Sequence, residues 1–389
     1  MRPTFVLAFL TSSVCSVLSG PVGDKAPIIK RAALVKPNSY IIKLKDGVPK
    51  SAHIAGLLSG SKVAYTYDRA FQGYSAQLEG KALEYVRQSK DVEYIIQDEI
   101  VKLQDISTSS AQVTTRNAWY ESSPLVKRVN GTGVDVYQID TGIYTAHTQF
   151  GGRAKWGATF GGVRTFLFEP VQQPTDITFD PALASLIVGS TYGVATRANI
   201  TAIKGRSIGS IRHPFGDDGS ANLSDVIQGI NWVITTAAST GRPSIISLTV
   251  TISGYQPFDN AVTNAINAGI HVVVAAGDQN VDASTISPAR VTVAVTVGAV
   301  VANGNKLSTS NFGSVVDVWG PGKNVPVAWI TSPTAAVNLV GTTSSAASNV
   351  AGILAVAIDN HGNKSPAALQ ADLKSNAQTV NGFLIPKVW

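Results

Sequence analysis

The sequence predicts an α/β protein in which a mainly parallel sheet carries helices on both faces, preceded by a small α+β unit. Two observations lead to this prediction. From about residue 134 onward, short β-branched runs alternate with helical stretches, a pattern typical of parallel sheets covered by helices. Between residues 39 and 103 the order is instead strand, helix, strand, strand, helix, strand, which is the order of a ferredoxin-like unit.

The small unit is expected to contain four strands and two helices, each indicated by its apolar periodicity and its flanking turn residues. The predicted strands are SYIIKL (39–44), KVAYTY (62–67), YSAQLE (74–79) and DVEYIIQ (91–97), and the predicted helices are SAHIAGLL (51–58) and ALEYVRQ (82–88). Residues 104–118 then run through a stretch rich in Ser and Thr and low in large apolar side chains. We expect an exposed linker there.

The larger unit, residues 119–389, is expected to form the parallel sheet. Its predicted strands are VDVYQI (134–139), NITAIK (199–204), SIISLTV (244–250), HVVVAA (271–276), VTVAVTV (291–297) and VVDVWG (315–320), and two of its predicted helices are LSDVIQGINWVITTAA (223–238) and FDNAVTNAINAG (258–269). Functional groups of open α/β sheets collect at the carboxyl ends of strands. Asp140 follows one such strand directly, which makes it a candidate site residue.

The N-terminus indicates export. Residues 1–20 contain one Arg, an apolar run and then small residues, as in a secretory signal peptide, and no later segment is apolar for long enough to span a membrane. The only cysteine, Cys15, lies in this leader, so the mature chain is expected to contain neither a disulfide nor a thiol ligand. Asn130, Asn199 and Asn222 begin glycosylation motifs, so we expect a secreted, extracellular glycoprotein.

The charge pattern argues against a nucleic-acid partner. Charged residues make up 14% of the chain, against about 25% in an average domain. The formal net charge of +6 comes from 31 basic and 25 acidic residues that are interspersed along the chain. Neither a basic block nor a basic stretch with interleaved aromatic residues is present.

Several segments, in order along the chain, resemble the subtilisin-like serine proteases, specifically the secreted proteinase K-like branch. These segments are VDVYQIDTGIYTAHTQFGGRA (134–154), STYGVAT (190–196), SIISLTV (244–250), VVVAAGDQN (272–280), ISPA (286–289), NFGSVVDVWGPG (311–322) and SSAASNVAGILA (344–355). Residues 39–103 are similar to the inhibitory propeptide of that family. The resemblance implies a subtilisin-like fold, a serine endopeptidase ancestry and an intramolecular propeptide partner.

In this family a Ser, a His and an Asp act as one unit. The resemblance places the aspartate at Asp140 and the nucleophile at Ser344, although a serine in this position can also simply start a helix. The position of the catalytic histidine falls on Asp180. Asp180 precedes Pro181 and an apolar run, which is also the pattern of a helix N-cap. The histidines that the chain does have are expected to be structural or solvent-facing: His53, His147, His213, His271 and His361.

The oxyanion-binding asparagine of the family falls on Asp278. An amide can donate a hydrogen bond to an oxyanion, whereas an ionised carboxylate can only accept one. The Gly-Gly pair of the substrate cleft is replaced by Thr249 and Val250, and the acidic residue of a family calcium site is replaced near Val301. We therefore expect neither a metal nor another cofactor.

These substitutions predict a catalytically impaired pseudoprotease that binds a peptide or a protein, and we expect it to be a monomer. The alternative is an active serine endopeptidase shifted to acidic pH, with Asp180 as the base and a protonated Asp278 as the oxyanion donor. A third hypothesis makes the propeptide-like unit the working part, as an inhibitor or folding aid. A misassigned exon around residues 165–186, where the histidine is missing, is a fourth.

Overall fold

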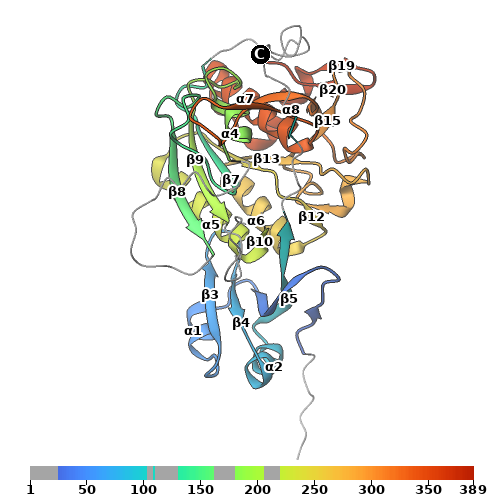
Figure 1. Ribbon diagram of the computed structural model, residues 1–389. Coiled ribbons are helices and arrows are strands. Elements are labelled where there is room, and N and C mark those ends of the chain that lie inside the picture. The colour runs from blue at the N-terminus through green and yellow to red at the C-terminus, as the bar shows by residue number, and fades with distance from the viewer. Residues whose placement is uncertain (1–24, 103–107, 110–129, 162–179, 206–219) are drawn as a thin grey trace, which may run out of the picture.

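The computed structural model describes residues 25–102, 108–109, 130–161, 180–205 and 220–389. The predicted signal peptide, residues 1–20, lies outside the described residues, as does most of the predicted linker, residues 104–118. Figure 1 shows a small unit, residues 25–102, joined to a larger one. We call them the N-terminal unit and the C-terminal unit.

The N-terminal unit has the predicted ferredoxin-like order. Its elements are β1 (Ile28–Ile29), β2 (Val35–Leu44), α1 (Lys50–Ala55), β3 (Lys62–Tyr67), β4 (Gly73–Gln77), α2 (Gly80–Gln88) and β5 (Val92–Lys102). Strands β5, β2, β4 and β3 lie side by side in that order, and each neighbouring pair is antiparallel. The sheet buries Ile42, Leu44, Tyr74 and Ile95 together with Val86 of α2. Burial of these large apolar side chains is the main stabilising contribution to the unit.

The C-terminal unit contains the predicted parallel sheet. Seven strands lie in the order β16, β15, β13, β11, β7, β9, β8, and every neighbouring pair is parallel. Their bounds are β7 (Asp135–Asp140), β8 (Ala154–Phe160), β9 (Asn199–Gly205), β11 (Ser244–Leu248), β13 (His271–Ala275), β15 (Val295–Val300) and β16 (Val318–Pro321). The predicted parallel sheet is confirmed.

Helices cover both faces of this sheet, as the alternating pattern predicts (Figure 1). On one face lie α4 (Asp180–Val188), α7 (Thr343–His361) and α8 (Pro366–Ser375), and on the other lie α5 (Leu223–Thr240) and α6 (Gln256–Asn267). Shorter elements complete the unit: β6 (Thr108–Ser109), β10 (Ser220–Asn222), β12 (Ile252–Ser253), η1 (Ala283–Thr285), β14 (Ile286–Ser287), β17 (Val325–Ala328), β18 (Ala336–Leu339), β19 (Gln378–Val380) and β20 (Phe383–Ile385).

Two predicted strands begin later than their apolar runs. The run from residue 291 opens with a turn, in which the Ala294 amide donates to the Val291 carbonyl at 2.9 Å, and β15 starts only at Val295. The run from residue 315 likewise begins in a turn, and β16 starts at Val318. A continuous apolar run indicates burial rather than secondary structure, so its boundaries are the weakest part of such a prediction.

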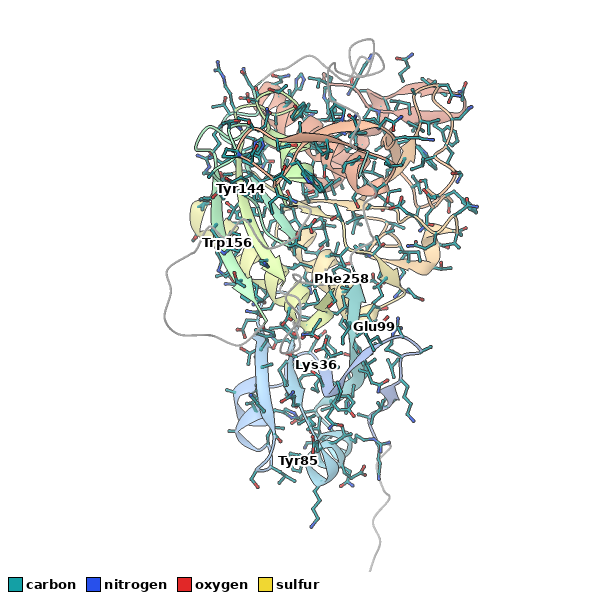
Figure 2. All side chains as sticks on the ribbon, viewed as in Figure 1. Lys36, Tyr85, Glu99, Tyr144, Trp156 and Phe258 are labelled. Carbon is teal, nitrogen blue, oxygen red and sulfur yellow. The ribbon has the colours of Figure 1, made fainter. Side chains whose placement is uncertain are left out.

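The two units share one apolar interface. Ile41, Tyr67, Phe71 and Ile96 of the N-terminal unit belong to the same buried cluster as the inner faces of α5 and α6. The last residues of β5 also pair antiparallel with β10, so the N-terminal sheet continues into the C-terminal unit. Figure 2 shows Lys36 and Glu99 at this junction, with Phe258 of α6 beyond it.

Helix α7 runs through the core and is buried along most of its length, from Thr343 to Ile358. It packs on β11, β13, β15 and β16 and crosses α4. The crossing is close because Gly352 has no side chain: a Cβ there would lie 2.8 Å from Cβ of Val194 and 3.2 Å from the carbonyl oxygen of Ile187. In the described part of the chain, no helix is long and apolar enough to cross a membrane.

We predict that Gly352→Ala lowers the free energy of unfolding by about 1–3 kcal/mol, because overpacking forces the α4 and α7 backbones apart. Urea unfolding followed by circular dichroism measures the change. Gly229→Ala in α5 is the matched control, since its Cβ would meet only side-chain methyl groups, at 3.2 Å or more. Equal destabilisation by the two substitutions would contradict this account of the crossing.

Candidate active site

The candidate site lies where three neighbouring strands of the parallel sheet end. Asp140 is the last residue of β7, Thr249 follows β11, and Asp278 comes three residues after β13. Strand β11 lies between β7 and β13, with Leu248 opposite both Ile139 and Val274. The register therefore brings residues that are more than a hundred positions apart to one edge of the sheet.

Asp140 is buried, at 5% exposure, and both of its carboxylate oxygens accept hydrogen bonds. The Thr141 amide donates to Oδ1 at 2.8 Å, and the Thr249 hydroxyl donates to Oδ2 at 3.0 Å. Burial raises the pKa of Asp140 above its usual value, and the bonds from Thr141 and Thr249 oppose the rise. Among the described residues, the aspartate is thus held by Thr141 and Thr249 and by no histidine.

Asp278 is an acceptor at the N-terminus of α7. Its Oδ1 accepts from the Thr343 amide at 2.8 Å, and its Oδ2 accepts from the hydroxyls of Thr342, at 2.9 Å, and Thr343, at 3.1 Å. A carboxylate in this position satisfies an otherwise unpaired helix amide and faces the positive end of the helix dipole. Burial raises the pKa of Asp278, and these three hydrogen bonds oppose the rise.

Ser344 lies in the first turn of α7, one residue after Thr343. Thr342 is the N-cap residue, and its hydroxyl accepts the Ser344 amide hydrogen bond at 3.1 Å. Two backbone donors of this turn, the amides of Thr343 and Ser344, are therefore engaged within the protein. Among the described residues, no hydrogen bond joins the side chains of Asp140, Asp278 and Ser344 to one another.

The loop that carries Asp278 is fixed by Asn311. The side-chain oxygen of Asn311 accepts from the backbone amides of Gln279 and Val281, both at 3.0 Å. Its side-chain nitrogen donates to the Ala276 carbonyl at 2.8 Å. Gly277 adopts φ +98°, and a Cβ there would lie 2.4 Å from the Asn311 side chain. The glycine is required at this point, and the loop has little freedom to move Asp278 away from α7.

The position of the family histidine falls at the start of α4. Helix α4 begins at Asp180, but the Asp180 side chain and residues 162–179 lie outside the described part, as does His213. The four described histidines all have partners away from Asp140 and Ser344. His53 contacts Tyr74 and Asp91, His147 contacts the Ala335 carbonyl, His271 contacts Asn363, and His361 stacks on Trp389.

Three residues of the site were missed as partners when only the sequence was considered: Thr249, Thr342 and Thr343. The sequence did mark Thr249 as a departure from a Gly-Gly pair. The register of the strands could have identified Asp140 as its partner, since the residue after β11 lies beside the end of β7. Thr342 and Thr343 lie 64 and 65 positions from Asp278 in the chain, and no local pattern links them.

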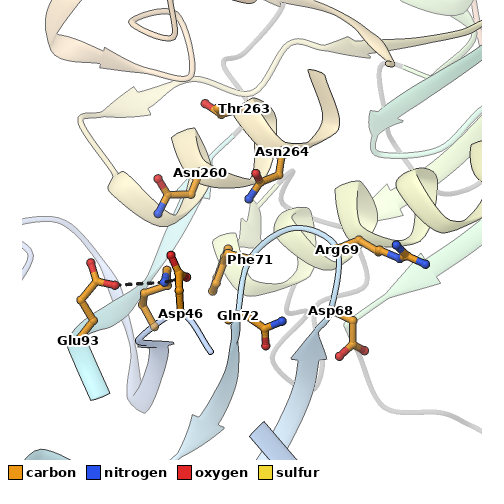
Figure 3. A pocket seen from close by; sticks show the side chains of 10 residues that line it. Asp46, Asp68, Arg69, Phe71, Gln72, Glu93, Asn260, Thr263 and Asn264 are labelled. Atoms are coloured by element: carbon orange, nitrogen blue, oxygen red, sulfur yellow. Dashed lines mark hydrogen bonds and ion pairs between the residues drawn. The ribbon is translucent and has the colours of Figure 1, made fainter. Parts of the chain in front are cut away.

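No group of three or more His, Cys, Asp or Glu residues in the described ranges could hold a metal ion. A hollow of about 480 Å³ lies elsewhere, between the N-terminal unit and α6. Figure 3 shows it lined mostly by polar and charged side chains, with Phe71 among them. The Lys43 ammonium group pairs with Glu93 at 3.1 Å. None of the candidate site residues lines this hollow.

Comparisons with known proteins agree with this architecture. Residues 181–386 match the subtilase family, Peptidase S8, and residues 39–104 match peptidase inhibitor I9. Subtilisin-like protease 2 of Pseudogymnoascus destructans is 33% identical over 363 residues, which cover 87% of this chain and 84% of the relative. Subtilisin-like serine protease AsES of Sarocladium strictum is 32% identical over 337 residues, covering 83% of this chain and 80% of the relative.

A solved structure supports the same assignment. The crystal structure of a cold adapted subtilisin-like serine proteinase superposes with a TM-score of 0.58 at 28% identity, covering 71% of this chain and 98% of the other. The chain therefore belongs to the subtilase family, and its N-terminal unit is a propeptide of the peptidase inhibitor I9 type.

Proposed function

We propose that this subtilase is a secreted pseudoprotease that binds an extended peptide or protein segment and does not hydrolyse it efficiently. The observation that carries the proposal is the state of Asp278. The Asp278 carboxylate accepts three hydrogen bonds, all from Thr342 and Thr343. A carboxylate that accepts hydrogen bonds from the helix cannot donate one to an oxyanion, as the family asparagine does. Losing one oxyanion donor costs roughly 2.7–4 kcal/mol of transition-state stabilisation.

The environment of Asp140 supports the same proposal. In a serine protease triad this carboxylate orients a histidine, whereas here the Thr249 hydroxyl occupies Oδ2. The engaged amide of Ser344 removes a further donor from the place where an oxyanion would form. Asp278, Asp140 and the Ser344 amide thus all form hydrogen bonds within the protein.

Binding of an extended segment is supported by the pairing of β5 with β10. Lys102, Val101 and Ile100 lie opposite Ser220, Ala221 and Asn222 in antiparallel register. Adding a strand to an exposed edge is a common way to bind a peptide, because main-chain hydrogen bonds give affinity without demanding one sequence. In the intact chain this edge is filled by the N-terminal unit, so we infer that the propeptide is the resident ligand and that the protein is a monomer.

An acid-shifted endopeptidase is the second candidate, and one observation favours it. Burial raises the pKa of Asp278, so a proton is bound more readily there than on an exposed aspartate. A protonated Asp278 has a hydrogen to donate. The candidate still lacks a described base, and the amides of Thr343 and Ser344 remain engaged.

Secretion is inferred from the leader at residues 1–20. Of the three glycosylation motifs, Asn222 does not fit a glycan in the folded protein. Its side chain is 2% exposed, and its amide nitrogen donates to Asp225 at 2.8 Å. A glycan attached after folding is therefore proposed at Asn130, because the Asn199 amide nitrogen also donates to an aspartate, Asp135, at 3.2 Å.

We predict that the purified protein hydrolyses peptide substrates no faster than its Ser344→Ala variant from pH 3 to pH 8, because the donors and the base of the reaction are missing. Fluorogenic peptides and labelling with a serine-directed fluorophosphonate probe measure this. An Asp180→His, Asp278→Asn double variant tests whether the two substitutions are sufficient to restore labelling. An acid-only rate maximum that Ser344→Ala abolishes would instead establish the second candidate.

We predict that Thr249→Val lowers the free energy of unfolding by about 1–3 kcal/mol, because it leaves one oxygen of a buried carboxylate unpaired. Thr249→Ser, which keeps the donor, is the matched control and is expected to lose less than half as much. Urea unfolding at pH 7 gives both values. Unchanged stability in Thr249→Val would show that this hydrogen bond does not hold Asp140.

We predict that the N-terminal unit stays covalently attached, since self-cleavage requires an active site. N-terminal sequencing of protein from the medium should therefore give a start close to the signal-peptide cleavage site, and not one near residue 104. The Ser344→Ala variant should give the same start. A start near residue 104 in the wild type alone would overturn the pseudoprotease proposal.

A further inference from the structure

Two buried carboxylates meet where the N-terminal unit docks on the C-terminal unit. Asp98 comes from β5 and Asp225 from the first turn of α5, and they are 0% and 2% exposed. Asp98 accepts three hydrogen bonds: from the Ser224 amide at 3.0 Å, the Ser224 hydroxyl at 2.7 Å and the Ser39 hydroxyl at 2.9 Å. The ionised form of Asp98 is thus well supported by donors and by the helix N-terminus.

Asp225 is less well supported. It accepts from the Asn222 amide at 2.8 Å and from the Tyr65 hydroxyl, and Asp98 is a like charge nearby. The carbonyl oxygen of the same Asn222 side chain is buried and has no hydrogen-bond partner among the described residues. A carboxylate can only accept from an amide group, whereas a carboxylic acid can also donate to an amide oxygen. A proton on Asp225 would therefore supply a donor beside an amide group whose oxygen is buried and unpaired.

The charged and titratable groups around the pair come from both units. Tyr65 of β3 and Lys36 of β2 face Asp225, while Tyr67, Tyr255 and Lys36 face Asp98. Lys36 is the cation that opposes the repulsion, yet it forms no ion pair with either carboxylate in the described residues. Tyr65 is itself held by the Gly161 amide at 2.8 Å.

We propose that this contact is a proton-dependent latch, in which Asp225 carries a proton while the N-terminal unit is docked and releases it when the unit detaches. Tyr65, Lys36 and Asp98 all belong to the N-terminal unit, as does β5, the partner of β10. Detachment therefore returns Asp225 to water and removes the like charge beside it. The latch does not depend on whether Ser344 cuts peptides.

The direction of the pH dependence follows from the burial of Asp225. Burial raises its pKa from the usual value to about 6, the repulsion from Asp98 adds to the rise, and the hydrogen bonds from Asn222 and Tyr65 oppose it. Burial raises the pKa of Asp98 in the same direction. A carboxyl group with a raised pKa in the docked state binds a proton on docking, so docking is favoured at acidic pH and weakens as the pH rises through about 6.

We predict that amide protection at residues 100–102 and 220–222 falls about tenfold between pH 5 and pH 7.5, after correction for intrinsic exchange, as a docked pKa of about 6 requires. Hydrogen–deuterium exchange of the full chain measures it. All proteins carry Ser344→Ala, so the chain stays uncut whether or not the wild type is active. Amides of β13 report global unfolding and are expected to keep their protection.

Three variants separate the latch from ordinary docking contacts. Asp225→Asn should abolish the tenfold change, because the amide cannot titrate. Tyr65→Phe removes a donor that favours the charged form, so it should move the midpoint to higher pH. Asn231→Ala is the control. The Asn231 side-chain oxygen accepts from the backbone amides of Asp68, Arg69 and Ala70. Losing these hydrogen bonds should lower protection equally at both pH values.

Two results would overturn the proposal. One is a wild-type interface with equal protection at pH 5 and pH 7.5. The other is an Asp225→Asn variant that keeps the wild-type tenfold change, which would assign the proton to another group. Because hydrolysis is not measured in this experiment, neither result bears on the pseudoprotease proposal.

Discussion

The burial of α7 against the parallel sheet is the constraint on which the rest of the site depends. Residues 350–358 of α7 are all apolar or glycine and are buried on every side, so this part of the helix has to lie in the core and fixes where the first turn emerges. That turn meets Asp278, in the loop after β13, at the edge of the sheet where such folds place their chemistry. Ser344, Thr342 and Thr343 are therefore held against Asp278 by packing that extends as far as Gly352.

The sequence was sufficient to predict what depends on local pattern. The ferredoxin-like order of the N-terminal unit, the parallel sheet and the helices on both faces all follow from periodicity, and the structure confirms them. The position of Asp140 at a strand end was predictable for the same reason. The late starts of β15 and β16 were not predictable from the sequence. The residues before these strands form turns, although several of them are apolar.

The partners of the site carboxylates were beyond sequence reasoning for a different physical reason. The residue type alone predicts that Asp278 accepts hydrogen bonds. Its donors, however, lie more than sixty positions away in the chain and reach it only through the packing of α7. The carboxylate pair of Asp98 and Asp225 is separated by an even longer stretch of chain. Each of its members looks like an ordinary surface acid until the two units dock.

The carboxylates of the candidate site are held by hydrogen bonds within the fold, and these bonds bear on the proposed loss of hydrolysis. A buried carboxylate without donors is costly, and Thr141 and Thr249 supply hydrogen bonds that stabilise Asp140. A histidine brought to Asp140 would have to compete with the Thr249 hydroxyl for Oδ2. An asparagine at position 278 would still meet a helix turn whose amides seek acceptors. Under the pseudoprotease proposal, recovery of hydrolysis would require several concerted changes, since each single one meets a hydrogen bond that already stabilises the fold.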